Sequence, residues 1–192
     1  FIFYPKSARY IEPAKASRIT DHLPHGVTRV GVFVNQDISE IRDIASLCRL
    51  DIIQLHGDES PEYCCNFSPD MIIKSVNLKS FDDLNVLPDY NVKAFLVDSR
   101  EGALYGGTGK TTDWGLASRA AISFPLILAG GLNEENIERA VDWVSPDAVD
   151  INSGVEIMPG KKDHEKVRRI IDVLRRRKQP GPARTGIFTV QK

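Results

Sequence analysis

The chain has 192 residues, which is enough for one domain with a substantial apolar core. Hydrophobic residues make up 42% of it and charged residues 27%, ordinary values for a globular protein, and the net charge of −1 does not indicate binding to nucleic acid or to a membrane surface. The apolar runs are far shorter than a membrane span, and the N-terminus lacks the basic segment of a signal peptide.

The three cysteines are Cys48, Cys64 and Cys65. They include no C-x-x-C spacing and two of them are adjacent, so the sequence predicts neither a disulfide framework nor a zinc site. This cysteine usage fits a reducing compartment, and we expect a cytoplasmic protein without a bound metal ion.

Short apolar runs alternate along the chain with segments of helical pattern. Runs of strand length occupy residues 1–4, 30–34, 52–55, 71–73, 94–97, 126–129 and 148–151. Helices are predicted at residues 13–22, 37–48, 81–87, 114–121, 133–144 and 167–174, with a short one after residue 60. After residue 178 a Pro/Gly-rich stretch ends the last helix, and residues 187–190 are predicted either as a strand or as disordered.

Capping residues indicate where several of these helices begin. Pro13 suits a first helical turn, and Asp37 has the spacing of a capping box with Glu40. Ser60 is a favourable N-cap, and Asn133 is predicted to cap the helix of residues 133–144. The basic run 175–178 is interpreted as a complement to the C-terminal end of the last helix, not as a nucleic-acid site.

The predicted strands are apolar without strict alternation, as expected when both faces of a parallel sheet are covered by helices. The repeated βα pattern allows an eight-fold barrel lacking one unit or an open doubly wound sheet. Polar or glycine-rich residues follow five of the strands, at 6–9, 56–57, 98, 130–131 and 153–154. Five such strand ends favour the barrel, with its active site at the carboxyl ends of the strands.

Asp98 directly follows one apolar strand and precedes the glycine-rich stretch 105–111. A carboxylate in this position is a common arrangement for acid–base chemistry in α/β enzymes. The stretch is not a P-loop, because the position five residues before Gly109 is Leu104 and the motif requires glycine there. The alternative is that Asp98 only caps a turn and that the stretch is a long surface loop.

Two further strand ends together predict a phosphate site. Gly130 and Gly131 follow one strand, and residues 152–156 follow the next and are expected to open a short helical turn. Glycines let the backbone approach an anion, and free N–H groups at the start of a helix donate to it. The last two strands of a barrel are the usual place for such a site. The alternative is that both glycine pairs only form tight turns.

Several stretches match a known family in the family's order. They are FIFYPKSARY (1–10), VGVFVN (30–35), IQLHGDE (53–59), VDS…YGGTGKTTDW (97–114), LAGGLNEENI (128–137) and VDINSGVE…PGKKDH (149–164). On these motifs residues 1–177 resemble the phosphoribosylanthranilate isomerases of tryptophan biosynthesis. The resemblance implies a (βα)8 TIM barrel of the ribulose-phosphate-binding type and an Amadori rearrangement that needs no cofactor. The implied partner is the small-molecule substrate phosphoribosyl anthranilate, with no nucleic acid or membrane, and the implied assembly is a monomer or homodimer.

The resemblance also implies roles for individual residues. Asp98 matches the general acid that protonates the ring oxygen, and Arg9 matches the arginine that holds the anthranilate carboxylate. Gln54 and His56 match residues that line the site, and for His56 the alternative is a purely structural hydrogen bond. The phosphate positions of the family correspond to Gly130, Gly131, Asn152, Ser153 and Gly154.

The sequence departs from the family pattern in two places. Asn152 stands where the family usually has serine, and an amide can still bind phosphate. The family's first strand ends in Lys-Ile-Cys-Gly, whose cysteine is the general base, and this sequence contains no such motif. We therefore expect the first βα unit and the base to precede Phe1. On this interpretation residues 1–178 are units two to eight of the barrel, and residues 179–192 are a flexible tail.

Two other functions remain open at this point. One is a catalytically inactive truncated barrel that still binds a sugar phosphate. The other is a different phosphate-binding barrel isomerase, such as an aminosugar isomerase of histidine synthesis, which QLHG and GGTGKT fit less well.

Overall fold

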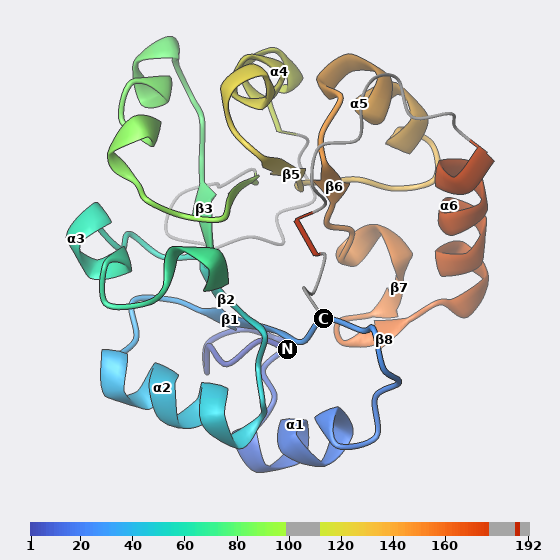
Figure 1. Ribbon diagram of the computed structural model, residues 1–192. Helices are drawn as coiled ribbons and strands as arrows, with labels where there is room; N and C mark the ends of the chain where they lie inside the picture. The colour runs from blue at the N-terminus through green and yellow to red at the C-terminus, as the bar shows by residue number, and fades with distance from the viewer. Residues whose placement is uncertain (99–111, 177–186, 189–192) are drawn as a thin grey trace. The chain divides into compact units, whose positions relative to one another are not determined.

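Figure 1 shows the computed structural model of the chain, which describes residues 1–98, 112–176 and 187–188. The chain divides into two compact units. Unit 1 comprises Phe1–Ser75, Pro88–Ala94 and Phe188, and unit 2 comprises Val76–Leu87 and the described part of Phe95–Ile187. In unit 1, β1 (Val30–Phe33), β2 (Ile52–Leu55) and β3 (Ile72–Val76) pair in parallel in that order, and in unit 2, β4 (Ala94–Val97), β5 (Leu126–Leu128) and β6 (Ala148–Val149) do the same. The predicted α/β class with a parallel sheet is therefore confirmed.

Unit 1 alternates strands with short helices. Its elements are α1 (Pro13–Thr20), β1 (Val30–Phe33), α2 (Ile38–Leu47), β2 (Ile52–Leu55), α3 (Pro61–Cys64), the 3₁₀ helix η1 (Pro69–Met71), most of β3 (Ile72–Val76) and most of the 3₁₀ helix η3 (Leu87–Asp89). Figure 1 shows α1 and α2 side by side next to β1. The apolar core includes Phe3, Phe33, Ile41, Ile53, Leu55 and Ile72.

The N-terminal residues run beside β1 without forming a full strand. The N–H of Phe3 donates to the carbonyl of Val32 at 2.9 Å, and the N–H of Val32 donates to the carbonyl of Phe1 at 2.8 Å. Ile2 forms an isolated parallel bridge with Val32. The strand predicted at residues 1–4 is thus present only as this short pairing. The rings of Phe3 and Phe33 stack at 5.3 Å and fix it to the core.

Unit 2 continues the βα pattern. Its elements are the 3₁₀ helix η2 (Phe81–Leu84), most of β4 (Ala94–Val97), α4 (Trp114–Ser123), β5 (Leu126–Leu128), α5 (Ile137–Val144), β6 (Ala148–Val149), the 3₁₀ helix η4 (Ser153–Val155), β7 (Glu156–Met158), β8 (Lys161–Lys162) and α6 (His164–Arg176). Helices α4 and α5 lie side by side (Figure 1). Phe95 packs edge-on against Phe124, with ring centroids 5.3 Å apart. The guanidinium of Arg139 lies 5.8 Å from the ring centroid of Trp114, and Trp143 is exposed on the same helix as Arg139.

Local sequence signals predicted most helix starts correctly. The side chain of Asp37 accepts from the N–H of Ser39, and that of Ser60 accepts from the N–H of Tyr63, so both are N-caps. Asn133 does not cap α5. Its side chain accepts from the N–H of Glu135 in a turn, and the helix begins only at Ile137, because the polar residues 133–136 bond to one another first.

Three further elements differ from the expectation. The helix predicted at residues 81–87 is replaced by the 3₁₀ helix η2 at Phe81–Leu84, since Ser80 and Asp83 close a capping box around one short turn. Strands β7 and β8 form an antiparallel hairpin that the sequence did not predict. Ile187 is buried and lies with Phe188 in a turn, not in a strand, and the rest of the segment 187–190 lies outside the described residues.

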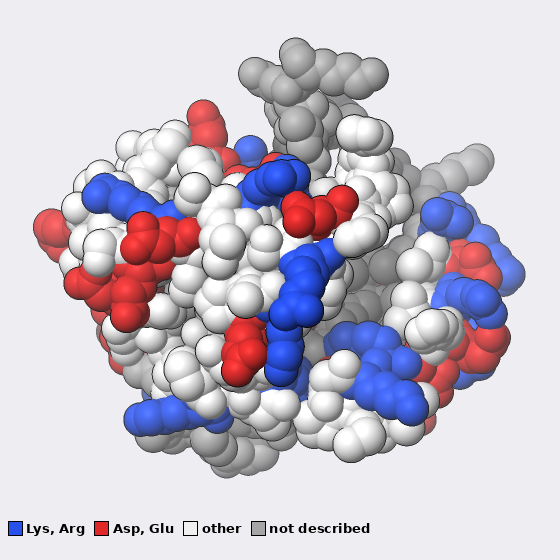
Figure 2. Space-filling view, turned by 90° about the horizontal axis from the view of Figure 1, so that it is seen from below, with Lys and Arg blue, Asp and Glu red and all other residues white. Residues whose placement is uncertain are grey.

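The charged surface is mixed in sign. On the face shown in Figure 2, Lys and Arg side chains are interspersed with Asp and Glu side chains, which agrees with the near-zero net charge. No helix in the described part of the chain is long and apolar enough to cross a membrane.

An ion pair ties together the starts of β1 and β2. The guanidinium of Arg29 donates to both carboxylate oxygens of Asp51, at 2.9 and 2.8 Å, and the backbone N–H of Arg29 also donates to Asp51 at 2.7 Å. The bonds from Arg29 hold the pKa of Asp51 below its ordinary value. The pair therefore stabilises the folded chain fully at neutral pH, and the stabilisation is lost as the pH falls through the lowered pKa.

We expect Asp51→Asn to lower the free energy of unfolding by about 1 kcal/mol at pH 7, because the pair is partly exposed. The difference from wild type should shrink as the pH falls below about 4, where the wild-type carboxylate also becomes protonated. Urea titrations over this pH range measure the difference in the free energy of unfolding. The exposed Asp43, changed to Asn on α2, is the control and should show neither effect. A difference that persists unchanged at acid pH would contradict the assignment.

Candidate functional site

Gln54 and His56 are brought together at the end of β2. Both side chains are buried, and the amide nitrogen of Gln54 lies 3.1 Å from Nδ1 of His56. The N–H of His56 donates to the carbonyl of Phe33 at 2.8 Å, which continues the ladder between β1 and β2. With the amide donating, Nδ1 is the acceptor and the ring proton sits on Nε2, so the imidazole presents a donor away from Gln54.

Arg9 lies in the turn segment between Ile2 and Ile11, also in unit 1. The N–H of Ser7 donates to the carbonyl of Tyr4, the N–H of Arg9 donates to the hydroxyl of Ser7 at 3.1 Å, and the N–H of Ile11 closes the loop onto the carbonyl of Ile2. The side chain of Arg9 is half-buried. Its guanidinium can form the paired hydrogen bonds that a carboxylate accepts.

Asp98 directly follows β4 in unit 2. Its N–H donates to the carbonyl of Val76 at 3.2 Å, and its side chain is half-buried. The glycine-rich stretch 105–111 lies outside the described residues. Where the described chain resumes, the buried hydroxyl of Thr112 donates to the carbonyl of Ala129 at 2.9 Å, so this point is fixed next to the end of β5.

The glycine pair after β5 has the conformation that only glycine adopts readily. Gly130 has φ +84° and Gly131 has φ +63°, both in the left-handed region. The carbonyl of Gly131 accepts from the amide of Asn136 at 2.9 Å, and the side-chain oxygen of Asn136 accepts from the N–H of Asn133. Asn136 therefore shapes this loop.

Gly154 brings the second loop against the first. A Cβ at position 154 would lie 2.0 Å from the carbonyl oxygen of Leu132 and 3.0 Å from Cβ of Asn133, so a side chain does not fit. Among the described residues, none accepts a hydrogen bond from the N–H of Ser153 or of Gly154. These two donors open η4 and are available to an anion.

Lys162 was not identified from the sequence, and it holds the loop that contains Asn152. Its ammonium donates to the carbonyl of Asn152 at 2.9 Å, to the side-chain oxygen of the same residue, and to Glu156 at 3.0 Å. The carboxylate of Glu156 also accepts from the N–H of Gly160. The signal in the sequence was the second lysine of PGKKDH, but only the β7–β8 hairpin brings it back to the loop.

The cysteines do not lie at the strand ends. Cys48 follows α2 and Cys64 ends α3, and both are buried. Burial raises the pKa of the Cys48 thiol, and it raises the pKa of the Cys64 thiol to about 11. Cys65 is exposed. Within the described ranges no group of three or more His, Cys, Asp or Glu side chains is arranged to hold a metal ion.

Comparisons with known proteins agree with these motifs. The family described as N-(5'phosphoribosyl)anthranilate (PRA) isomerase matches residues 1–173. The N-(5'-phosphoribosyl)anthranilate isomerase of Syntrophus aciditrophicus is 53% identical over 176 residues, which cover 92% of this chain and 76% of that protein.

Solved structures of the same enzyme have a similar fold. The phosphoribosyl anthranilate isomerase of Thermotoga maritima has a TM-score of 0.80 and 44% identity, covering 90% of this chain and 84% of that one. A phosphoribosyl anthranilate isomerase in complex with reduced 1-(o-carboxyphenylamino)-1-deoxyribulose 5-phosphate has a TM-score of 0.76 and 41% identity, with the same coverage. The chain belongs to the N-(5'-phosphoribosyl)anthranilate isomerase family.

Proposed function

We propose that this protein catalyses the isomerisation of N-(5'-phosphoribosyl)anthranilate to 1-(2-carboxyphenylamino)-1-deoxyribulose 5-phosphate in tryptophan biosynthesis. The observation that carries the proposal is the pair of glycine loops in unit 2, where the backbone of Gly154 packs on Leu132 and leaves two N–H groups for an anion. A sugar phosphate supplies that anion. The reaction itself is inferred from membership of the family.

The reaction needs an acid and then a base. An acid protonates the ring oxygen of the aminoaldose while its C1–O bond breaks, and the nitrogen lone pair forms the C1=N bond of an iminium ion. A base then removes the proton on C2, and the electrons of that C–H bond form the enolamine, which tautomerises to the ketone. We assign the acid to Asp98, whose half-buried carboxyl group follows β4 in the same unit as the glycine loops.

We assign the remaining predicted residues to substrate binding. Arg9 holds the anthranilate carboxylate, a task that suits a planar guanidinium. Gln54 and His56 contribute hydrogen-bonding groups, with the imidazole oriented by the amide of Gln54. Gly130, Gly131, Asn152, Ser153 and Gly154 hold the phosphate, chiefly through backbone N–H groups. No cofactor takes part in the proposed reaction.

We further propose that none of the described cysteines is the base. A base must reach C2 of the substrate, whereas Cys48 and Cys64 are buried at the ends of α2 and α3 with raised pKa values, and Cys65 is exposed just after α3. As the family resemblance implies, we propose that the base belongs to the first βα unit of a (βα)8 barrel. In that case the full-length protein isomerises the substrate and the 192-residue chain only binds it.

The partner is a small molecule, and we propose a cytoplasmic enzyme that is a monomer or a homodimer. Size-exclusion chromatography with light scattering decides between the two assemblies. The reduced product, reduced 1-(o-carboxyphenylamino)-1-deoxyribulose 5-phosphate, serves as the binding probe. If the full-length protein binds it but does not convert the substrate, that result would support the alternative of an inactive sugar-phosphate-binding barrel.

Asp98→Asn in the full-length protein should lower kcat by about 10²-fold or more while KM changes little, because the amide cannot donate a proton to the ring oxygen. Steady-state kinetics at saturating substrate measure this. Asp172→Asn, an exposed carboxylate on α6, is the control and should retain full activity. A kcat within a few-fold of wild type would remove Asp98 from the mechanism.

Gly154→Ala should weaken binding of inorganic phosphate and of the reduced product at least about tenfold, because the new methyl group displaces the loop from Leu132. Isothermal titration calorimetry on the 192-residue chain measures it. Gly26→Ala is the control, since a Cβ at Gly26 meets no atom within 4 Å, although alanine is strained at its φ of +89°. Equal affinities for wild type and Gly154→Ala would place the anion elsewhere.

The three thiols should react at very different rates with a disulfide reagent at pH 8. Cys65 reacts at once, whereas Cys48 and Cys64 react only when the chain unfolds, because they are buried and their pKa values are raised. The absorbance of the thiolate that the reagent releases gives the number of protein thiols that have reacted. Cys65→Ser should remove the fast phase, and a fast phase of more than one thiol in the folded chain would contradict the burial of the other two.

A further inference from the structure

The most deeply buried charges of unit 1 form an ion pair to which the proposed reaction assigns no role. The ammonium of Lys74 lies 2.9 Å from Oε2 of Glu59, and their side chains are only 3% and 1% exposed. Removing two charges from water costs several kcal/mol per ion, and apolar replacements of such pairs are often neutral or stabilising. Stability alone therefore does not explain this pair, and its contacts indicate what else it does.

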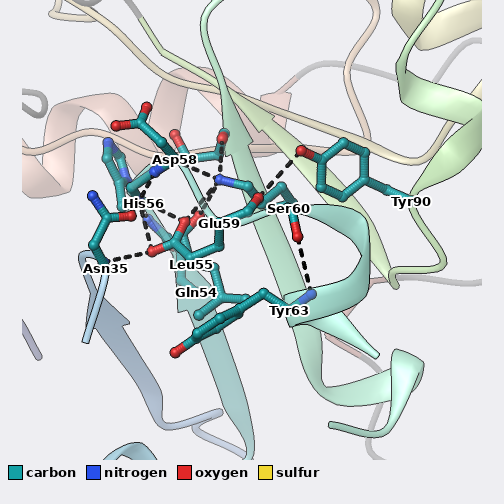
Figure 3. A network of polar contacts seen from close by, with 12 residues as sticks. Asn35, Gln54, Leu55, His56, Asp58, Glu59, Ser60, Tyr63 and Tyr90 are labelled. Atoms are coloured by element: carbon teal, nitrogen blue, oxygen red, sulfur yellow. Dashed lines mark hydrogen bonds and ion pairs between the residues drawn. The ribbon is translucent and has the colours of Figure 1, made fainter. Parts of the chain in front are cut away.

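The carboxylate of Glu59 joins the loops that follow β1 and β2 (Figure 3). Its Oε1 accepts from the N–H of Asn35 at 2.8 Å, and both of its oxygens accept from the N–H of Gly57, at 3.1 and 2.9 Å. Asn35 has the unusual φ of +48°, and its side-chain oxygen accepts from the N–H of Asp58 at 2.7 Å. The two loops are thus bonded to each other twice.

The ammonium of Lys74 fixes the backbone on both sides of His56. It donates to the carbonyl of Leu55 at 3.4 Å and to that of Gly57 at 2.8 Å, besides its bonds to Glu59 and to the carbonyl of Ser75 at 3.0 Å. The peptide group before His56 and the peptide group after Gly57 are therefore held from the neighbouring strand β3.

Position 57 admits no side chain beside this pair. A Cβ there would lie 2.2 Å from the side-chain oxygen of Asn35 and 2.6 Å from Oε1 of Glu59. The glycine thus lets the carboxylate approach the backbone next to His56. The hydroxyl of Tyr90 donates to the carbonyl of Glu59 at 3.2 Å and holds the far side of the loop (Figure 3).

We propose that Glu59 and Lys74 are positioning residues, which hold the imidazole of His56 in the orientation that the substrate requires. The inference rests on the proposed function. The amide of Gln54 contacts Nδ1 of His56 at 3.1 Å, and the direction of the imidazole also depends on where the backbone of His56 lies. A displacement of about 1 Å in a substrate-positioning group is sufficient to cost about 10²-fold in rate.

The same unit contains a matched control. Arg29 and Asp51 pair at the N-terminal ends of β1 and β2, whereas Lys74, inside β3, pairs with Glu59 at the C-terminal end of β2. Glu59→Gln and Lys74→Met remove one charge each with little change of volume, and Asp51→Asn removes a charge of the control pair. Comparing them separates a loss of stability from a loss of orientation.

The first measurement is the ¹⁵N chemical shifts of the His56 ring in the 192-residue chain, assigned by their absence in His56→Gln. We expect Glu59→Gln and Lys74→Met to move them and Asp51→Asn to leave them unchanged. The second is the kinetics of the full-length protein under conditions where each variant is folded. We expect kcat/KM to fall about 10- to 100-fold for Glu59→Gln and less than twofold for Asp51→Asn.

Unmoved His56 signals together with a kcat/KM within twofold of wild type would overturn the proposal and leave the pair a structural role. If both charge variants fail to fold, the Asn35→Gly variant tests the positioning proposal instead. Glycine tolerates the left-handed φ, and the change removes the side-chain bond to Asp58 while Glu59 and Lys74 stay in place, so a smaller shift of the same signals is expected. Unmoved signals in that variant would also overturn the proposal. An inactive wild-type enzyme would refute the proposed function, whereas the ring shifts would still test the positioning.

Discussion

The parallel register of β1 and β2 is the constraint on which unit 1 depends. Val30 pairs with Ile52 and Phe33 pairs with Leu55, so the residues that flank the two strands meet at both ends. At the starts of the strands this produces the ion pair of Arg29 with Asp51. At their ends it brings the loop of Asn35 against the loop that follows His56. A shift of the register by one residue would reverse the faces of all four strand residues and separate both sets of contacts.

The two units handle negative charge in different ways. Unit 1 uses side-chain cations: Arg29 neutralises Asp51 near the surface, and Lys74 neutralises Glu59 in the interior. In unit 2 the proposed phosphate site relies on the backbone N–H groups of Ser153 and Gly154, which have a fixed direction and would cost no side-chain entropy on anion binding. The ammonium of Lys162 in unit 2 is hydrogen-bonded to other residues of the protein, the carbonyl of Asn152 and the carboxylate of Glu156.

The sequence predicted the strands well, because parallel strands covered on both faces are short apolar runs that are easy to recognise. Elements that depend on competition between local bonds were predicted less well. Asn133 was expected to cap α5, but its side chain closes a turn first. The β7–β8 hairpin is only a few residues long, and no apolar pattern marks it.

The candidate site was predictable only in part. The glycines at 130, 131 and 154 were identified from their chemistry, and the φ values and close packing explain why they are glycines. Glu59 and Lys74 were not identified, because the burial of a charge depends on a partner in the next strand. The available signal was a lysine inside the apolar run of β3, which is unusual unless that lysine is paired.

The distribution of aromatic side chains has a consequence for spectroscopy. The chain contains two tryptophans, Trp114 and Trp143, and both belong to unit 2. Their indole emission therefore reports directly on that unit, and with the guanidinium of Arg139 close to the ring of Trp114 it will also respond to rearrangement of α5. Unit 1 contains tyrosines but no indole, so the opening of its core could pass unseen in an emission trace. A tryptophan introduced into α1 or α2 would make the two units distinguishable in a single optical experiment.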